Sequence, residues 1–199
     1  MKSENEYIGD DKLQKLLEHY ACPTPLEVVK LRFAGAICSP NGDLRPTDVI
    51  SSLWENNNTP RLETKKEAEL FFKFFMGLWD DIFHKITRNN ITLPKISADD
   101  NLLKVCESRY EMIELGFVEG FWGGLEDIKV PAHVAEVVDS LSRLALLYKS
   151  LAGKITPGKE NKNIFTAIID CDKTVNKSIG YLIEHYALPH IEELTRTVH

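Results

Sequence analysis

Apolar side chains recur along most of this chain at intervals of three and four residues, the spacing typical of an α-helix. The clearest example begins at Thr64, which forms the sequence pattern of a capping box with Glu67. The apolar positions that follow share one face and predict a helix of roughly 24 residues and ~36 Å: Phe71, Phe75, Leu78, Ile82 and Ile86. Further aromatic residues widen this face, so we expect the helix to be central and buried on more than one side.

The same spacing predicts further helices on both sides of this one. They cover residues 10–20, 24–38 and 46–54 before it, then 97–121, 131–152 and a last long helix beyond residue 163, with a short one beginning at Pro189. Thr24 and Glu27 are expected to form a second capping box, and Ser97 is expected to cap the helix of residues 97–121, with Leu103 on its inner face. No segment alternates at period two, so the predicted fold class is all-α, a single compact domain of about seven or eight helices.

A short segment rich in glycine, proline and lysine divides the chain. Residues 153–162 contain Gly153, Pro157 and Gly158 and are expected to form an exposed linker. Residues 1–152 are then the helical domain, and residues 163–199 are a C-terminal helical segment that docks on this domain or on a partner. The apolar stripe of that segment has a near-heptad rhythm that breaks at Asp172, so docking within its own chain is favoured over a coiled coil.

The charge balance narrows the kind of partner. The chain has 24 lysines and arginines against 30 aspartates and glutamates, a net charge of −6. An acidic chain is poorly suited to bind nucleic acid directly or to bind an anionic membrane surface, because both require basic side chains. No run reaches the ~20 apolar residues of a membrane span, and residues 1–11 lack the apolar core of a signal peptide. We therefore expect a cytoplasmic protein.

Candidate chemical groups are sparse. The four cysteines, at positions 22, 38, 106 and 171, form no C-x-x-C pair, and no common nucleophile, phosphate-loop or metalloprotease motif occurs. Three weak clusters remain, which we interpret as solvated helix faces or an adventitious metal site: Asp80, Asp81 and His84; Glu107, Glu111 and Glu114; Glu184, His185, His190 and Glu193. The expectation is no catalytic residue, no metal site and no cofactor, with any cofactor-binding residue left unidentified.

One segment needs a specific explanation, because glycines recur in it every fourth residue. Each glycine in a helix costs about 1 kcal/mol relative to alanine, but a row of them lets another backbone approach closely. Tight packing inside the domain is the favoured interpretation. The alternative is a ligand groove or a partner-docking surface anchored by aromatic residues. The candidate motif comprises Gly116, Phe117, Gly120, Phe121, Trp122 and Gly124.

The same segment carries a family resemblance. Residues 119–125, EGFWGGL, and the apolar helix that ends in SRLALL at 142–147 resemble the YecA/YgfB-like family of small bacterial proteins. TPLE at 24–27 and AICSP at 36–40 are similar to that family's first helix, and the similarity spans residues 10–150. The resemblance implies an all-helical cytoplasmic protein without an assigned activity. Some relatives carry a zinc-binding tail rich in cysteine, but residues 150–199 contain one cysteine, so no zinc is carried over.

These observations lead to three hypotheses about function. The leading one is a non-enzymatic protein-interaction or regulatory module that binds a protein partner through a helical surface. The alternative is a small-molecule-binding protein or an enzyme with a pocket beside the ridge of residues 116–124. The third is a homodimer assembled through the C-terminal helix.

Overall fold

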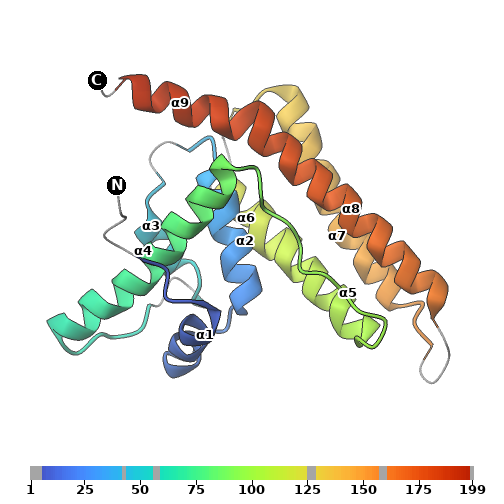
Figure 1. Cartoon of the computed structure of the whole chain (residues 1–199), viewed down its shortest axis with the longest axis horizontal. Helices are drawn as coiled ribbons and strands as arrows, with labels where there is room; N and C mark the ends of the chain where they lie inside the picture. Colours follow the sequence, from blue (N-terminus) through green and yellow to red (C-terminus); the bar gives the residue numbers. More distant parts are fainter. Residues whose placement is uncertain (1–5, 42–43, 56–58, 125–128, 157–160, 198–199) are drawn as a thin grey trace.

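The computed structural model describes residues 6–41, 44–55, 59–124, 129–156 and 161–197 (Figure 1). All regular structure in these ranges is helical, which confirms the all-α prediction. The first half of the chain contains α1 (Asp10–His19), α2 (Leu26–Ile37), α3 (Pro46–Ser51) and α4 (Lys65–Thr87). The second half contains α5 (Leu102–Tyr110), η2 (Glu111–Val118), α6 (Glu119–Trp122), α7 (Ala132–Ala152), α8 (Lys162–Leu182), η3 (Ile183–Ala187) and α9 (Leu188–Thr197).

The central helix of the domain is α2, not α4. Its sequence, LEVVKLRFAGAI, is apolar on nearly every side, and α2 packs against η2, α6 and α4. The inner face of α4 is buried as predicted, but Leu70 and Phe72 on its other side are exposed. The expectation that α4 is buried on more than one side is therefore wrong, and Figure 1 shows α4 at the outside of the bundle.

One of the three predicted helix caps is confirmed. At α4 the Thr64 hydroxyl accepts from the Glu67 amide at 3.1 Å, and the Glu67 carboxylate accepts from the Thr64 amide at 3.4 Å. The Thr24 box does not form, because the Thr24 hydroxyl instead donates to the Leu53 carbonyl at 2.7 Å and so ties the start of α2 to the turn after α3.

The predicted start of the fifth helix is also wrong. Ser97 and Asp100 form a separate turn, in which the Ser97 amide donates to the Asp100 carboxylate at 2.7 Å. The helix begins at Leu102, where the Asn101 side chain accepts from two backbone amides at 3.1 and 3.2 Å. Asparagine and serine are both good N-caps, so composition alone does not distinguish the two positions.

Two π-helical segments connect consecutive helices without a break. The sequence predicted one regular helix where the first segment lies and two separate helices where the second lies. η2 joins α5 to α6, and η3 joins α8 to α9, so that α8, η3 and α9 form one long rod (Figure 1). Pro189 lies just after η3 and does not interrupt the rod, contrary to the prediction of a separate short helix. A proline clashes with the carbonyl four residues earlier in a regular α-helix, and the wider π turn relieves that conflict.

The rod docks on the domain through a buried polar anchor. α8 packs against α7 and α5, and the Asp172 carboxylate on α8 accepts from Arg109 of α5 and from the Tyr148 hydroxyl of α7. The break in the apolar rhythm at Asp172 is thus the contact that fixes α8 to its neighbours. The bounds of α7 and α8 leave residues 153–161 between them, of which 157–160 lie outside the described residues. None of the described helices is long and apolar enough to cross a membrane.

Candidate binding groove

The glycine ridge faces the interior at two of its three positions. A Cβ atom placed on Gly120 would lie 2.2 Å from the Arg32 carbonyl oxygen, and one on Gly116 would lie 2.9 Å from the Leu31 Cβ. On the opposite helix, a Cβ on Gly35 would lie 2.1 Å from the Phe117 carbonyl oxygen. The three glycines therefore let the backbones of α2 and of η2–α6 touch directly.

The third glycine of the ridge has a different position. Gly124 is exposed, with φ +72° and nothing within 4 Å of a Cβ placed on it, so it takes no part in the packing. Gly123 ends α6 at φ +58°, a left-handed conformation that favours glycine. The ridge predicted from Gly116 to Gly124 is corrected to Gly116 and Gly120, with Gly35 as their counterpart.

The aromatic residues of the motif are mostly enclosed. Phe117 and Phe121 are fully buried, and Trp122 is half-buried. The Phe121 ring lies 6.1 Å from the ring of Tyr186 in η3, so the C-terminal rod packs against this segment. Phe121 therefore has no exposed surface with which to anchor a partner in this arrangement.

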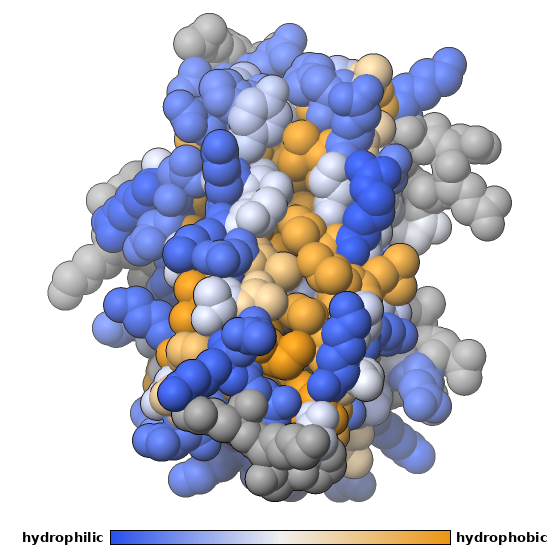
Figure 2. Space-filling model, turned by 90° about the vertical axis from the view of Figure 1, so that its right-hand side faces the viewer, coloured by the Kyte–Doolittle hydropathy of each residue, from blue (hydrophilic) through white to orange (hydrophobic). Residues whose placement is uncertain are grey.

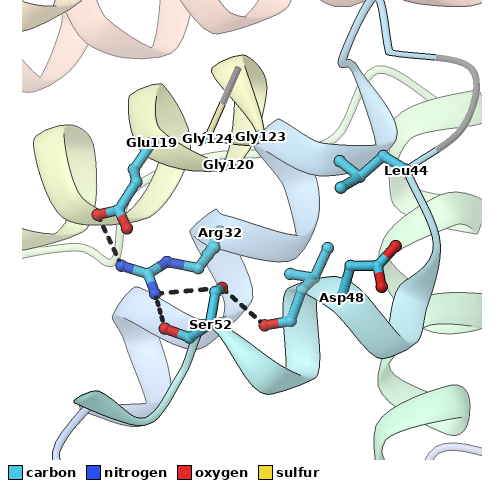
Figure 3. A pocket seen from close by; sticks show the side chains of 9 residues that line it. Arg32, Leu44, Asp48, Ser52, Glu119, Gly120, Gly123 and Gly124 are labelled. Atoms are coloured by element: carbon cyan, nitrogen blue, oxygen red, sulfur yellow. Dashed lines mark hydrogen bonds and ion pairs between the residues drawn. The ribbon is translucent and has the colours of Figure 1, made fainter. Parts of the chain in front are cut away.

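Three adjoining cavities open beside the ridge and share Arg32 as a common lining residue; together they form what we call the Arg32 groove. The first has a volume of about 370 Å³ and lies between α3 and α6 (Figure 3), lined by Arg32, Leu44, Asp48, Val49, Ser52, Glu119, Gly120, Gly123 and Gly124. The second, of about 380 Å³, reaches Pro23, Trp54 and Glu55. The third, of about 180 Å³, reaches Val28, Glu111 and Leu115.

Arg32 is buried in the groove, with 7% of its surface exposed. Its Nε and Nη2 both donate to the Leu115 carbonyl, at 2.9 and 2.6 Å, and Nη2 also donates to a Glu119 carboxylate oxygen at 2.8 Å. Nη1 donates to the Ser52 carbonyl at 2.6 Å and to the Ser52 hydroxyl at 3.4 Å. These contacts match the five N–H donors of a guanidinium. Arg32 thus connects α2, η2, α6 and the turn after α3.

Burial and charge act in opposite directions on this side chain. Burial lowers the pKa of Arg32, because a cation loses hydration there, and the neighbouring Glu119 carboxylate opposes that shift. The Leu115 carbonyl that receives two of the bonds belongs to the π-helical segment η2. The groove is therefore built around a charged clamp whose acceptors come from the protein itself.

Arg32 is the functional candidate that sequence reasoning missed. It stands inside an apolar run, and a cation in a helix that is apolar on all sides must find buried acceptors. The position of Arg32 in an apolar helix was therefore the sequence signal for a buried, hydrogen-bonded arginine. The acceptor at Leu115 lies 83 residues away in the sequence, so no local pattern identifies it.

Carboxylates predominate among the charged groups of the groove. Asp48, Glu55, Glu111 and Glu119 line it, and Arg32 is the single lysine or arginine among the described lining residues. Four carboxylates against one guanidinium give this set a net charge of −3. The formal charge of the lining is therefore negative, which disfavours anionic ligands.

Side chains of the predicted acidic and histidine clusters contact other residues of the protein. Asp81 forms an ion pair with Lys85 at 2.7 Å, while His185 and His190 lie against the rings of Tyr181 and Tyr186. Glu107 and Glu111 line a further cavity with Tyr110 and Lys149, which shares Glu111 with the Arg32 groove, and the Lys149 ammonium lies 3.6 Å from the centre of the Tyr110 ring. Within the described part of the chain, no three such side chains are placed to hold a metal ion.

A second surface feature is an apolar band on the side formed by α5, α7 and α8 (Figure 2). Large apolar side chains on these helices are exposed: Leu103, Leu146, Leu147 and Tyr181. The prediction that Leu103 faces inward is wrong. With α5 beginning at Leu102, the Leu103 side chain lies in the first turn, and 42% of its surface is exposed.

No protein-family model, curated protein or solved structure matches this chain. The function of the Arg32 groove therefore has to be inferred from its own residues and geometry.

Proposed function

We propose that this protein is a non-enzymatic interaction module of the cytoplasm that binds a protein partner in the Arg32 groove. The observation that carries the proposal is the full engagement of Arg32 by the Leu115, Ser52 and Glu119 acceptors. A guanidinium that stabilises a reacting group or binds an anionic substrate needs donors directed at that ligand. Here the donors are directed at the protein, so the side chain shapes the groove.

The packing behind the groove also supports a binding role. The close approach at Gly35, Gly116 and Gly120 fixes α2 against η2–α6, and Arg32 attaches the turn after α3 to the same unit. A surface that is already ordered loses less conformational entropy when a partner binds. The groove is thus suited to binding without prior rearrangement.

Two further features support a protein as the partner and the cytoplasm as the compartment. The acidic lining favours a protein partner over nucleic acid or an anionic membrane, since phosphates would be repelled. The four cysteines are free thiols, as is usual in a reducing compartment. The resemblance to the YecA/YgfB-like family stays a prediction and implies a cytoplasmic protein without an assigned activity.

Affinity recovery from the protein's own cells tests the proposal. Tagged wild-type protein and the double variant Glu55→Lys/Glu111→Lys are purified in parallel, and co-purifying proteins are quantified by mass spectrometry. We expect a stoichiometric partner with the wild type that is lost with the double variant. The control is Asp139→Lys, an exposed charge reversal on α7 outside the groove. Equal recovery by the double variant would contradict the proposal.

A second candidate function is favoured by the size of the first cavity. Its volume of about 370 Å³ falls within the range of small-molecule sites. A thermal-shift screen of metabolites tests this function, because a ligand that binds the native state raises the melting temperature. A shift that disappears in Leu44→Trp, which fills the cavity, would favour the small-molecule alternative over the protein partner.

The homodimer considered from the sequence also stays a prediction. That dimer is assembled through the C-terminal helix, and its structural support is the exposure of Tyr181 on α8. Light scattering distinguishes the cases: a dimer gives twice the mass of one chain and reverts to one chain in Tyr181→Ser. A single-chain mass for the wild type at high concentration would exclude it.

A further inference from the structure

The Arg32 groove combines apolar walls with an acidic rim. Its accessible apolar lining consists of Leu115, Pro23, Pro25 and the half-buried Leu44, whereas the other apolar lining residues belong to the buried core. Leu115 is 41% exposed although it stands beside the buried clamp, and the two prolines are also exposed. Apolar surface held open along a groove is typical of sites that receive apolar side chains from a partner.

The carboxylates are distributed along the groove, not gathered at one point. Besides Glu119, each cavity has an acidic residue of its own: Asp48 in the first, Glu55 in the second and Glu111 in the third. Glu119 is already paired with Arg32 at 2.8 Å. Asp48 accepts a bond from the Arg45 backbone amide at 3.0 Å, and this donor brings no opposite charge. A complementary ligand therefore needs several positive charges spaced along its length.

We propose that the partner segment bound in the Arg32 groove is a basic, partly apolar peptide, with lysines or arginines that meet Asp48, Glu55 and Glu111 and apolar side chains that enter the cavities. This inference rests on the function proposed above and names the chemistry of the partner. A polyamine matches the charges but leaves the apolar walls exposed to water. A peptide satisfies both features at once, because its charged and apolar side chains share one backbone.

The electrostatic part of this recognition has a measurable signature. Charge pairs at an interface rim strengthen association and are screened as the Debye length falls, from ~8 Å at physiological ionic strength to ~3 Å at 1 M salt. Binding of the basic peptide therefore weakens as salt is added. The apolar part persists at high salt, so some affinity remains.

Fluorescence anisotropy with labelled synthetic peptides tests the proposal on the full chain. The first probe has lysines separated by leucines, the second replaces the lysines with glutamates, and the third replaces the leucines with serines. We expect the first probe to bind, the second not to bind, and the third to bind about tenfold more weakly because it lacks apolar contacts. Tight binding of the glutamate probe, or equal binding of the first and third probes, would overturn the proposal.

Variants locate the binding site. Glu55→Lys/Glu111→Lys weakens the first probe by about tenfold, since two favourable charge pairs become repulsive. Asp139→Lys, with the same kind of charge change on α7, leaves the affinity unchanged, and circular dichroism checks that each variant folds. Equal affinities for the wild type and the double variant would overturn the inference. Full displacement of the probe by spermine at matched charge would also overturn the inference, because positive charge alone would then be enough for binding.

The outcomes separate this inference from the proposed function. If the co-purifying partner depends on Glu55 and Glu111 but no basic probe binds, the interaction module stands and the partner chemistry is wrong. If neither the partner nor the probe depends on these residues, both proposals are wrong.

Discussion

Arg109 of α5 and Asp172 of α8 form a bidentate ion pair, with Nε–Oδ1 and Nη2–Oδ2 distances of 3.0 and 3.1 Å. Arg109 is only 4% exposed, and it also donates to the Pro94 carbonyl. The Tyr148 hydroxyl of α7 donates to the same carboxylate at 2.6 Å. One carboxylate on α8 therefore joins the C-terminal rod to two helices of the domain.

Removal of the Asp172 carboxylate should strongly destabilise the fold. Asp172→Ala leaves the Arg109 cation buried without its partner, which costs about 3–5 kcal/mol. Urea denaturation followed by circular dichroism measures the free energy of unfolding. The matched control is Asp170→Ala, which breaks an exposed ion pair with Lys173 on the same helix and should cost no more than about 1 kcal/mol. Similar losses of unfolding free energy for both variants would contradict the role of Asp172 as the anchor of α8.

The Tyr148 hydroxyl should make the protein sensitive to alkaline pH. Burial and the bond to Asp172 raise the pKa of Tyr148 above its ordinary value of 10. The unfolded chain therefore releases this proton first, and the stability from this group is complete below pH 10 and lost as pH rises above it. Tyr148→Phe should show a flatter decline in unfolding free energy above pH 10 than the wild type. An unchanged decline, with the exposed Tyr181→Phe as control, would contradict this assignment.

A methyl group at Gly120 should disrupt the contact between α2 and α6. Its Cβ would lie 2.2 Å from the Arg32 carbonyl oxygen, which is backbone and has little freedom to move. Gly120→Ala should therefore cost about 3 kcal/mol or more, despite the higher helix propensity of alanine. Gly153→Ala is the control, because its nearest contact, at 3.7 Å, is ordinary. A neutral Gly120→Ala in chemical denaturation would show that the helices are not in close contact.

Replacement of Arg32 by lysine should weaken the clamp without removing its charge. A lysine has three donors on one nitrogen and cannot reach Leu115, Ser52 and Glu119 together. At least one buried carbonyl then loses its partner, which costs about 1–3 kcal/mol. Thermal unfolding measures this loss. If Arg32→Lys is as stable as the wild type, the five donated bonds are not the reason for the buried arginine.

The sequence predicted well what depends on residues close together in the chain. The stripe from Phe71 to Ile86 is buried, and the box between Thr64 and Glu67 caps α4. Helical periodicity and capping involve residues three or four apart, so both are readable without a structure. The choice between Ser97 and Asn101 shows the limit, since either residue can cap and the surrounding fold determines which one does.

The candidate groove depended on contacts between distant residues. Arg32 meets Leu115 and Glu119, 83 and 87 positions away, and Asp172 meets Arg109 across 63 positions. In the sequence, Arg32 is a cation in an apolar helix, and Asp172 is a break in a heptad rhythm. Each is a polar residue in an apolar pattern, which is a signal for a buried partner but does not name it.

Site-specific photo-crosslinking shows whether a protein partner occupies the Arg32 groove. A photoreactive amino acid is placed at Leu115, in the Arg32 groove, or at Leu103, on α5 outside it; the two side chains are 41% and 42% exposed. After irradiation of living cells, we expect a discrete crosslinked partner from position 115 and none from position 103. Crosslinks of equal yield at both positions, or none at position 115, would contradict partner binding in the groove.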